Sequence, residues 1–413
     1  MMKSFCFILL LLTSVRLTAQ FVSVDASHET SPVIVTGPNT GNNQLLYFTS
    51  SSLTADDRHL VFISDRTGNP NLVTRDLATG MERQLTTNTA GVLKSYVYFD
   101  GLPYRGFGKG SVSLDSKNGV VYFIEGREIR SVTLDGRQRV LAVLPKNQMT
   151  AFTHVSADGT RLCVPTTDAR ALDGDKILKG KPDYDIDARV QREHLVSYLH
   201  VYDTVSGKEI ACEPVTNAWI THVQFSPINN HLILYNHEYC FESGINRMWL
   251  WDGTNHIRLR VEGDGRSRAD WTCHEMWERD ASAIIYHGSY TNGQSYVGWV
   301  RPDGTGPVEI ALPDNWKRYG HFTVGHPGEL VTDGCYVVPG DPKRFGGNWI
   351  SVLRVDRSSR TCDWMPLCPH GSTWTSQDSH PHPIFDHAAS AIYFTSDAQG
   401  ERVVCRVAVP PSK

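Results

Sequence analysis

Short apolar runs bounded by turn residues recur along the chain. In the clearest unit, Asp56-Asp57 precedes the apolar run 60–63, a second run covers 71–74, and the segment 76–80 (Asp-Leu-Ala-Thr-Gly) forms a turn before a third run at 84–86. This pattern predicts β-strands joined by tight turns. Long amphipathic helical patterns are absent, apart from a polar insertion at about residues 169–193.

Similar units restart at intervals of roughly 40 to 70 residues. Together with the first they make seven units, and the later ones begin near Ser116, Asp158, Ile228, Asp280, Pro327 and His387. Short strands repeated at this period are typical of a β-propeller, in which blades pack radially around a central channel. We therefore predict an all-β fold, a single seven-bladed β-propeller over residues 21–413. The last unit stops one strand short at Val407, and we expect a strand near residues 45–49 to complete it and close the ring.

Composition and the N-terminus limit the classes of partner and location. Among 413 residues, 40 Lys and Arg nearly balance 44 Asp and Glu, so the chain lacks the excess of positive charge that favours nucleic-acid binding. Lys3, the apolar run 5–12 and the small residues up to Ala19 predict a signal peptide over residues 1–20, and thus a periplasmic or secreted protein. No later run is long enough to span a membrane. Eight cysteines remain after the signal, and both disulfides and scattered core thiols fit their spacing.

The histidines carry the clearest chemical signal. When the units are aligned on the turn after the innermost strand, four consecutive units have histidine at one position, namely His222, His274, His321 and His382. The first two units have Ser50 and Ser111 there. Because the innermost strands of a propeller line its channel, we expect the four imidazoles to converge.

The segment 377–383 (Gln-Asp-Ser-His-Pro-His-Pro) adds a second histidine to the last unit. Alternation along an extended chain puts His380 and His382 on one face, where their neutral nitrogens can share a metal ion with His321. A lone channel histidine such as His222 is more often a hydrogen-bonded core residue than a ligand.

Several ordered stretches resemble the oligogalacturonate lyases, seven-bladed propellers that cleave short pectin fragments by β-elimination. The matching stretches are 222–227 (HVQFSP), 236–238 (NHE), 247–250 (RMWL), 274–277 (HEMW), His321 followed by Asp333-Gly334, 377–383 (QDSHPHP) and 394–397 (FTSD). The resemblance implies that His321, Gln377, His380 and His382 bind a divalent metal, usually Mn²⁺. It also implies that His274 is the general base and Arg247 the catalytic arginine. His222 and His237 are further candidates for substrate binding.

These residue types suit elimination at a uronate. The C5 proton is weakly acidic, so the charge that develops as it leaves must be neutralised, which a metal ion and a guanidinium can do. A neutral imidazole can take the proton near neutral pH.

The sequence leaves several alternatives open. Arg247 can instead form a structural ion pair, and His274, His154 and His287 can be buried structural imidazoles. A propeller can serve as a non-catalytic carbohydrate- or protein-binding module. A hydrolase lacks support because no G-x-S-x-G motif supplies a nucleophile. The family's typical members are cytoplasmic whereas this chain has an apparent signal, so another uronate polymer such as ulvan is an alternative substrate.

Overall fold

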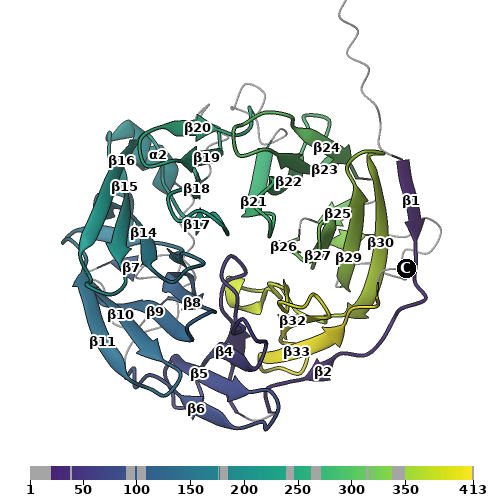
Figure 1. Ribbon diagram of the computed structural model, residues 1–413, viewed down its shortest axis with the longest axis horizontal. Helices are drawn as coiled ribbons and strands as arrows, with labels where there is room; N and C mark the ends of the chain where they lie inside the picture. The colour runs from purple at the N-terminus through teal and green to yellow at the C-terminus, as the bar shows by residue number, and fades with distance from the viewer. Residues whose placement is uncertain are drawn as a thin grey trace, which may run out of the picture.

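The fold is a ring of seven β-sheets around a central axis (Figure 1). The computed structural model describes residues 20–37, 40–89, 98–99, 108–174, 176, 185–238, 246–261, 271–312, 316–318, 320–336 and 349–411. The predicted seven-bladed β-propeller is therefore confirmed. The turns at which the repeats restart join the innermost strand of each blade to the next strand, as the sequence pattern predicts.

The first four blades follow one another along the chain, and the strands of each run from the innermost outward. Blade 1 comprises β3 (Asn43–Leu45), β4 (His59–Ser64), β5 (Asn71–Asp76) and β6 (Glu82–Gln84). Blade 2 comprises β8 (Val112–Asp115), β9 (Val120–Glu125), β10 (Glu128–Thr133) and β11 (Gln138–Val143). Blade 3 comprises β13 (His154–Val155), β14 (Arg161–Asp168), β15 (Val196–Asp203) and β16 (Glu209–Thr216), and β14 also pairs with β12 (Gln148–Thr150), which pairs with β7 (Tyr98–Phe99). Blade 4 comprises β17 (Val223–Phe225), β18 (Ile233–Asn236), β19 (Met248–Trp251) and β20 (His256–Arg258).

The last three blades continue the ring back to the N-terminal segment. Blade 5 comprises β21 (Trp271–Trp277), β22 (Ile284–Ser289), β23 (Ser295–Val300) and β24 (Val308–Ala311). Blade 6 comprises β26 (Phe322–Val324), β27 (Glu329–Thr332), β29 (Trp349–Asp356) and β30 (Thr361–Pro369). Blade 7 comprises β31 (Ile384–Phe385), β32 (Ala391–Ser396) and β33 (Val403–Ala408). A separate two-stranded sheet joins β25 (Trp316–Arg318) to β28 (Cys335–Tyr336).

The N-terminal segment closes the ring, but through a different strand from the one predicted. β2 (Val33–Ile34) pairs antiparallel with β33 and becomes the outermost strand of blade 7. β1 (Gln20–Val24) adds a fifth strand to blade 6, parallel to β30. The predicted closing strand at 45–49 was wrong, because Leu45 pairs with Phe62 in blade 1 and residues 46–49 leave the sheet. The run Leu46-Tyr47-Phe48 is apolar because it is buried beside the central histidines.

Apolar clusters between neighbouring blades hold the ring together. Each of the seven blade-to-blade contacts has its own buried cluster; Trp299 of blade 5 and Trp364 of blade 6, for example, share one of them. Because each blade is covered on both faces, its middle strands are apolar along their length, as in the run 60–63. Burial between blades therefore explains why these strands lack simple alternation.

The polar insertion in blade 3 packs against the segment just before β17. It contains η2 (Ala169–Ala171) and α2 (Ile186–Arg192), and Ile186 and Val190 pack against Trp219. No helix in the described ranges is both long and apolar enough to cross a membrane. All six cysteines whose side chains are described are free thiols. Residues 1–19 lie outside the described residues, so the signal peptide over 1–20 stays a prediction.

Candidate active site

Histidines from four consecutive blades gather at the centre of the ring. His222, His321 and His382 lie just before β17, β26 and β31, and His274 lies within β21. The His321 ring centroid is 4.2 Å from that of His382 and 4.5 Å from that of His274. His222 lies on the other side of Tyr47, whose ring centroid is 5.5 Å from His222 and 4.9 Å from His382. The structure thus brings together the residues that share one position in the repeats.

Two of these histidines have a left-handed backbone. His274 has φ 51° and His382 has φ 46°, a region that non-glycine residues rarely adopt. In β21 the unusual φ falls at a bulge between Cys273 and Met276, and bulges turn a side chain away from the regular alternation of a strand. Such conformations persist where the surrounding structure holds them, and they concentrate at functional sites.

The donor atoms of His321, His380 and His382 lie within 4.8 Å of one another. Gln377 begins the short 3₁₀ helix η4 (Gln377–Ser379), which leads directly into His380. Two buried atoms of this group, Gln377 Oε1 and His382 Nε2, have no hydrogen-bond partner in the described part of the chain. Buried polar atoms without partners are rare in folded proteins, so both fit the role of ligands to a cation. Three imidazole nitrogens and one amide oxygen suit a divalent first-row metal.

Asp333 orients His321. The backbone N–H of His321 donates to Asp333 Oδ1 at 2.6 Å, and its ring Nδ1 lies 2.9 Å from Asp333 Oδ2. Burial disfavours the charged carboxylate, but His321 outweighs this and holds the pKa of Asp333 below its ordinary value. A ring that donates Nδ1–H to a carboxylate presents its Nε2 lone pair to a metal ion.

A buried lysine from blade 2, Lys109, contacts the ring of His382. Lys109 is fully buried, and its Nζ lies 3.0 Å from His382 Nδ1. Burial lowers the pKa of Lys109 to about 8. Near pH 7 an amine with this pKa is still mostly protonated and donates to His382 Nδ1; its neutral form, which prevails above about pH 8, can accept Nδ1–H and leave the lone pair on Nε2, the atom without a partner. Nothing in the sequence around Lys109 signals this role, since the contact spans 273 positions of the chain.

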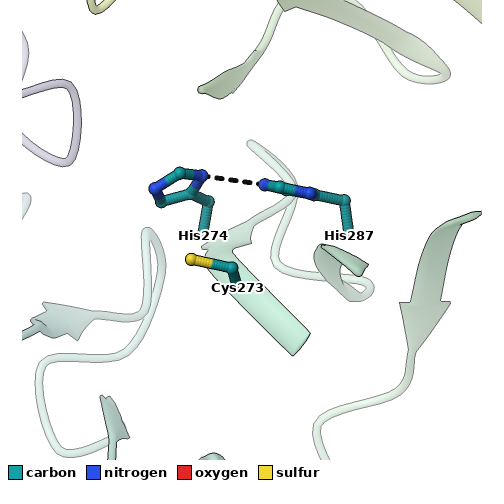
Figure 2. Close-up of side chains that lie close together, drawn as sticks. All are labelled: Cys273, His274 and His287. Carbon is teal, nitrogen blue, oxygen red and sulfur yellow. Dashed lines mark hydrogen bonds between the residues drawn. The ribbon is translucent and has the colours of Figure 1, made fainter. Parts of the chain in front are cut away.

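His274 makes two hydrogen-bond contacts through Nδ1, and Figure 2 shows the one to His287. His274 Nδ1 lies 2.8 Å from His287 Nε2 and 3.1 Å from the carbonyl oxygen of Gly320. The carbonyl can only accept, so Nδ1 carries the proton and Nε2 carries the lone pair. Burial, and then the charges of His321 and His287, hold the pKa of His274 well below 6.5, so the ring is neutral near pH 7. His274 is therefore presented as a neutral base at Nε2.

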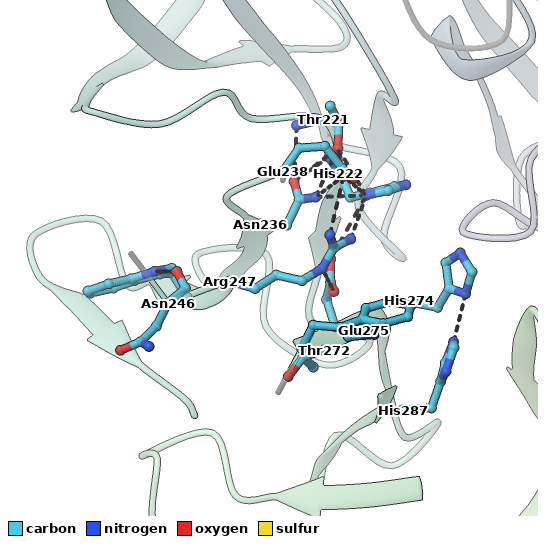
Figure 3. Close-up of polar contacts among 12 residues, drawn as sticks. Thr221, His222, Asn236, Glu238, Asn246, Arg247, Thr272, His274, Glu275 and His287 are labelled. Atoms are coloured by element: carbon cyan, nitrogen blue, oxygen red, sulfur yellow. Dashed lines mark hydrogen bonds and ion pairs between the residues drawn. The ribbon is translucent and has the colours of Figure 1, made fainter. Parts of the chain in front are cut away.

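Arg247 lies in a buried network of charges beside His274 (Figure 3). Its Nε–H donates to Glu275 Oε2 at 2.8 Å, and Nη1 is 3.4 Å from Glu238 Oε2. Burial opposes ionisation of Glu238, but Arg247 and other neighbours hold the pKa of that carboxyl below its ordinary value. One guanidinium between two carboxylates leaves a net negative charge of one. Both glutamates lie within the stretches 236–238 and 274–277, although the sequence does not show that they pair with Arg247.

His222 and His237 differ in their surroundings. His222 stacks on Phe152 with centroids 4.6 Å apart, and its Nε2 lies 3.2 Å from the Tyr47 hydroxyl. His237 stacks on Trp249 at 5.3 Å, and neither of its ring nitrogens has a hydrogen-bond partner within the described ranges. Burial lowers the pKa of His222 to about 4 and that of His237 to about 3.

Phe48 lies next to both the histidine cluster and a separate cavity. Its ring centroid lies between 5.2 and 5.9 Å from those of His274, His321 and His382. Phe48 also lines a cavity of about 420 Å³ together with residues such as Phe225 and Phe385. Phe48 is thus the residue shared by the histidine cluster and this cavity.

Together the fold and this centre define the class of protein: a seven-bladed β-propeller with a histidine cluster, suited to a metal ion, at the centre of its ring. No family model matches the chain. Two curated relatives do. An oligogalacturonide lyase of Pectobacterium atrosepticum is 26% identical over 221 residues, and an oligogalacturonate lyase of Dickeya dadantii is 28% identical over 209 residues. Each match covers 48% of this chain and 51% of the relative, so the chain spans about half the length of the curated relatives it matches.

Solved structures extend the likeness to nearly the whole chain. An oligogalacturonate lyase in complex with manganese superposes with a TM-score of 0.71 at 20% identity, over 91% of this chain and 92% of that one. An oligogalacturonate lyase from Vibrio parahaemolyticus gives 0.71 at 19% identity, over 91% and 93%. These comparisons confirm the resemblance of this chain to the oligogalacturonate lyase family. The catalytic and ligand roles of individual residues stay predictions.

Proposed function

We propose that this protein is a lyase that cleaves pectin-derived oligogalacturonates by β-elimination and leaves 4,5-unsaturated uronate products. The observation that carries the proposal is the hydrogen-bonded His274, a neutral imidazole whose lone pair lies on Nε2, next to a histidine cluster suited to a metal ion. The names of the curated relatives support the same substrate class.

In this proposal His274 Nε2 takes the C5 proton of the uronate. The imidazolium that forms keeps its Nδ1–H directed at the Gly320 carbonyl and at His287 Nε2, two acceptors that stabilise the new charge. The electron pair left at C5 forms the C4–C5 double bond as the glycosidic oxygen departs from C4. No water enters the products.

Arg247 is proposed to donate hydrogen bonds to the substrate carboxylate next to C5, while the metal would offset most of the charge of that carboxylate, because Glu238 and Glu275 already balance the guanidinium. Glu238 and Glu275 hold the plane of its guanidinium between them, which limits its freedom before substrate binds. A planar, forked donor matches a carboxylate better than an ammonium group does. His222 and His237 remain proposed substrate contacts.

His321, Gln377, His380 and His382 would hold the divalent metal, with Mn²⁺ the proposed ion. When bound, the metal would act as a Lewis acid on the uronate carboxylate. Asp333 and Lys109 hold the rings of His321 and His382 by their Nδ1 atoms. The chain's own contribution is thus that Asp333 fixes the direction of the His321 lone pair before the ion arrives, while Lys109 restrains the ring of His382.

The test is incubation of the purified, Mn²⁺-loaded protein with short oligogalacturonates while following the ultraviolet absorbance of a conjugated unsaturated uronate. The proposal expects absorbance and new reducing ends to rise together, and neither to rise with His274→Ala. Reducing ends without absorbance would indicate a hydrolase instead. Binding without either signal would indicate a non-catalytic carbohydrate-binding propeller, and turnover of ulvan oligomers alone would change the substrate.

Export of the mature chain to the periplasm or outside the cell is part of the proposal. It rests on the apolar run 5–12 and the small residues after it. N-terminal sequencing of the protein recovered from the medium or periplasm tests it, and a chain that retains Met1 would contradict it.

A further inference from the structure

A second group of metal-binding side chains lies in the outer half of blade 3, on strands that take no part in the central histidine cluster. His200 comes from β15, and Glu209 and Cys212 come from β16, the outermost strand of that blade. One donor atom from each of the three lies within 4.8 Å of the others. We call His200, Glu209 and Cys212 the blade 3 triad.

A β-bulge brings the triad together. His200 lies directly opposite Cys212 in the antiparallel pairing, so their side chains are neighbours on one face. Glu209 is three positions from Cys212 and would point to the other face of a regular strand. The register shifts between Val201 and Tyr202, and the extra residue restores Glu209 to the side of His200 and Cys212.

The His200 ring is held as metal-binding imidazoles usually are. Its Nε2 lies 3.0 Å from the hydroxyl of Thr166 on β14, and its Nδ1 lies 2.5 Å from Glu209 Oε1. The carboxylate can only accept, so without a cation Nδ1 carries the proton; when a cation takes the place of this proton, the proton moves to Nε2 and can be donated to the Thr166 hydroxyl, and such a bond to the second nitrogen commonly fixes the tautomer of a ligand histidine. The ring is buried, whereas Glu209 and Cys212 are exposed, so an ion can reach the triad from solvent.

The local charge favours a cation. No lysine or arginine of the described ranges forms an ion pair with Glu209, whose carboxylate lies 2.5 Å from His200 Nδ1. Glu213 pairs with His256 at 3.0 Å. A bound cation would offset the repulsion between these carboxylates and a thiolate.

We propose that the blade 3 triad is a second metal site, chemically distinct from the central one, that takes Zn²⁺ or a similar thiophilic divalent ion. One nitrogen, one sulfur and one carboxylate oxygen are the ligand types that Zn²⁺ uses, with water completing its tetrahedron. The central group of His321, Gln377, His380 and His382 contains no thiolate, so the two sites prefer different ions. Binding breaks the S–H bond of Cys212, forms a metal–sulfur bond and releases one proton to solvent.

Co²⁺ is the probe, because a thiolate ligand gives it an intense charge-transfer band in the near ultraviolet that nitrogen and oxygen ligands do not give. The full chain, stripped of metal under reducing conditions, is titrated with Co²⁺ and then with Zn²⁺. The proposal expects the band to report one thiolate-bound Co²⁺ per chain, in addition to any Co²⁺ that the central site binds without giving the band, and to be displaced by Zn²⁺.

Cys212→Ser should abolish the band. Cys273→Ser is the matched control, since Cys273 lies beside His274 and His287 and can also offer a thiolate. Glu209→Gln should weaken Co²⁺ binding at this site at least tenfold while keeping the fold. A band that survives Cys212→Ser, a band lost with Cys273→Ser alone, or no band at all would overturn the proposal. None of these readouts depends on lyase activity, so failure of this proposal can be distinguished from failure of the proposed function.

Discussion

Lowering the pH from 8 to 5 should destabilise the fold through three buried histidines. His222, His237 and His287 are each less than a tenth exposed, and burial lowers their pKa values to about 4, about 3 and about 3. In the unfolded chain histidine titrates near pH 6.5. Between these values the unfolded chain binds protons that the folded chain does not. The stability from these groups is therefore complete above pH 6.5 and is lost as the pH falls below it.

The size of the effect follows from the pH interval. The value pH 5 lies about 1.5 units below the pKa of histidine in the unfolded chain. This interval corresponds to a loss of folding stability of about 2 kcal/mol for each histidine and about 6 kcal/mol for three. The value requires only that the folded rings stay neutral at pH 5. A loss of this size is comparable with the whole stability of many proteins, about 5 to 15 kcal/mol. With an unfolding entropy of about 2.1 cal/mol/K per residue over 413 residues, the thermal midpoint should fall by about 7 °C.

The assay is thermal unfolding followed by circular dichroism at pH 8, 7, 6 and 5, with a chelator present so that loss of bound metal does not contribute. His237→Phe is the matched variant, because Phe keeps the stack on Trp249 and neither ring nitrogen of His237 has a partner to lose within the described ranges. The fall between pH 8 and 5 should be about a third smaller in this variant. Equal midpoints at pH 8 and 5, or an identical fall in the variant, would refute the reasoning.

Four further predictions concern the centre of the ring. His380→Ala with His382→Ala should remove the central metal, measured by elemental analysis, while the circular dichroism spectrum stays unchanged; full metal content would exclude both as ligands. Arg247→Lys keeps the charge but cannot reach both Glu238 and Glu275, so kcat/KM should fall at least tenfold, and unchanged turnover would leave Arg247 a structural role. His274→Ala should lower kcat by about 10² to 10⁴-fold with metal content near that of the unsubstituted protein; loss of the metal would make it a ligand. His287→Phe removes the acceptor 2.8 Å from His274 Nδ1, so kcat should fall about tenfold and the acidic limb of the pH profile should move, whereas a purely structural role would lower the thermal midpoint without moving that limb.

Much of the fold could be predicted from local pattern. Strand, turn and repeat signals act over a few residues, so the spacing of units such as 56–86 was enough to predict seven blades and the common position of His222, His274, His321 and His382. The strand that closes the ring could not be predicted from such local signals. Residues 33–34 and 45–49 are both short apolar segments, and only packing against β33 and burial beside the central histidines distinguish them.

The candidate site could also be predicted only in part from the sequence. The histidines and Gln377 are visible in the sequence because they sit at repeated positions or in one short segment. Their partners are not, because Lys109 meets His382 across 273 positions through the closure of the ring, and Arg247 meets Glu275 only where the neighbouring blades 4 and 5 pack together. The sequence by itself therefore determined which blades carry imidazoles and where along each strand they lie. Only the tertiary structure decided which nitrogen of each ring carries the proton, since that depends on a hydrogen-bond partner such as the Gly320 carbonyl or Asp333 supplied by another part of the chain.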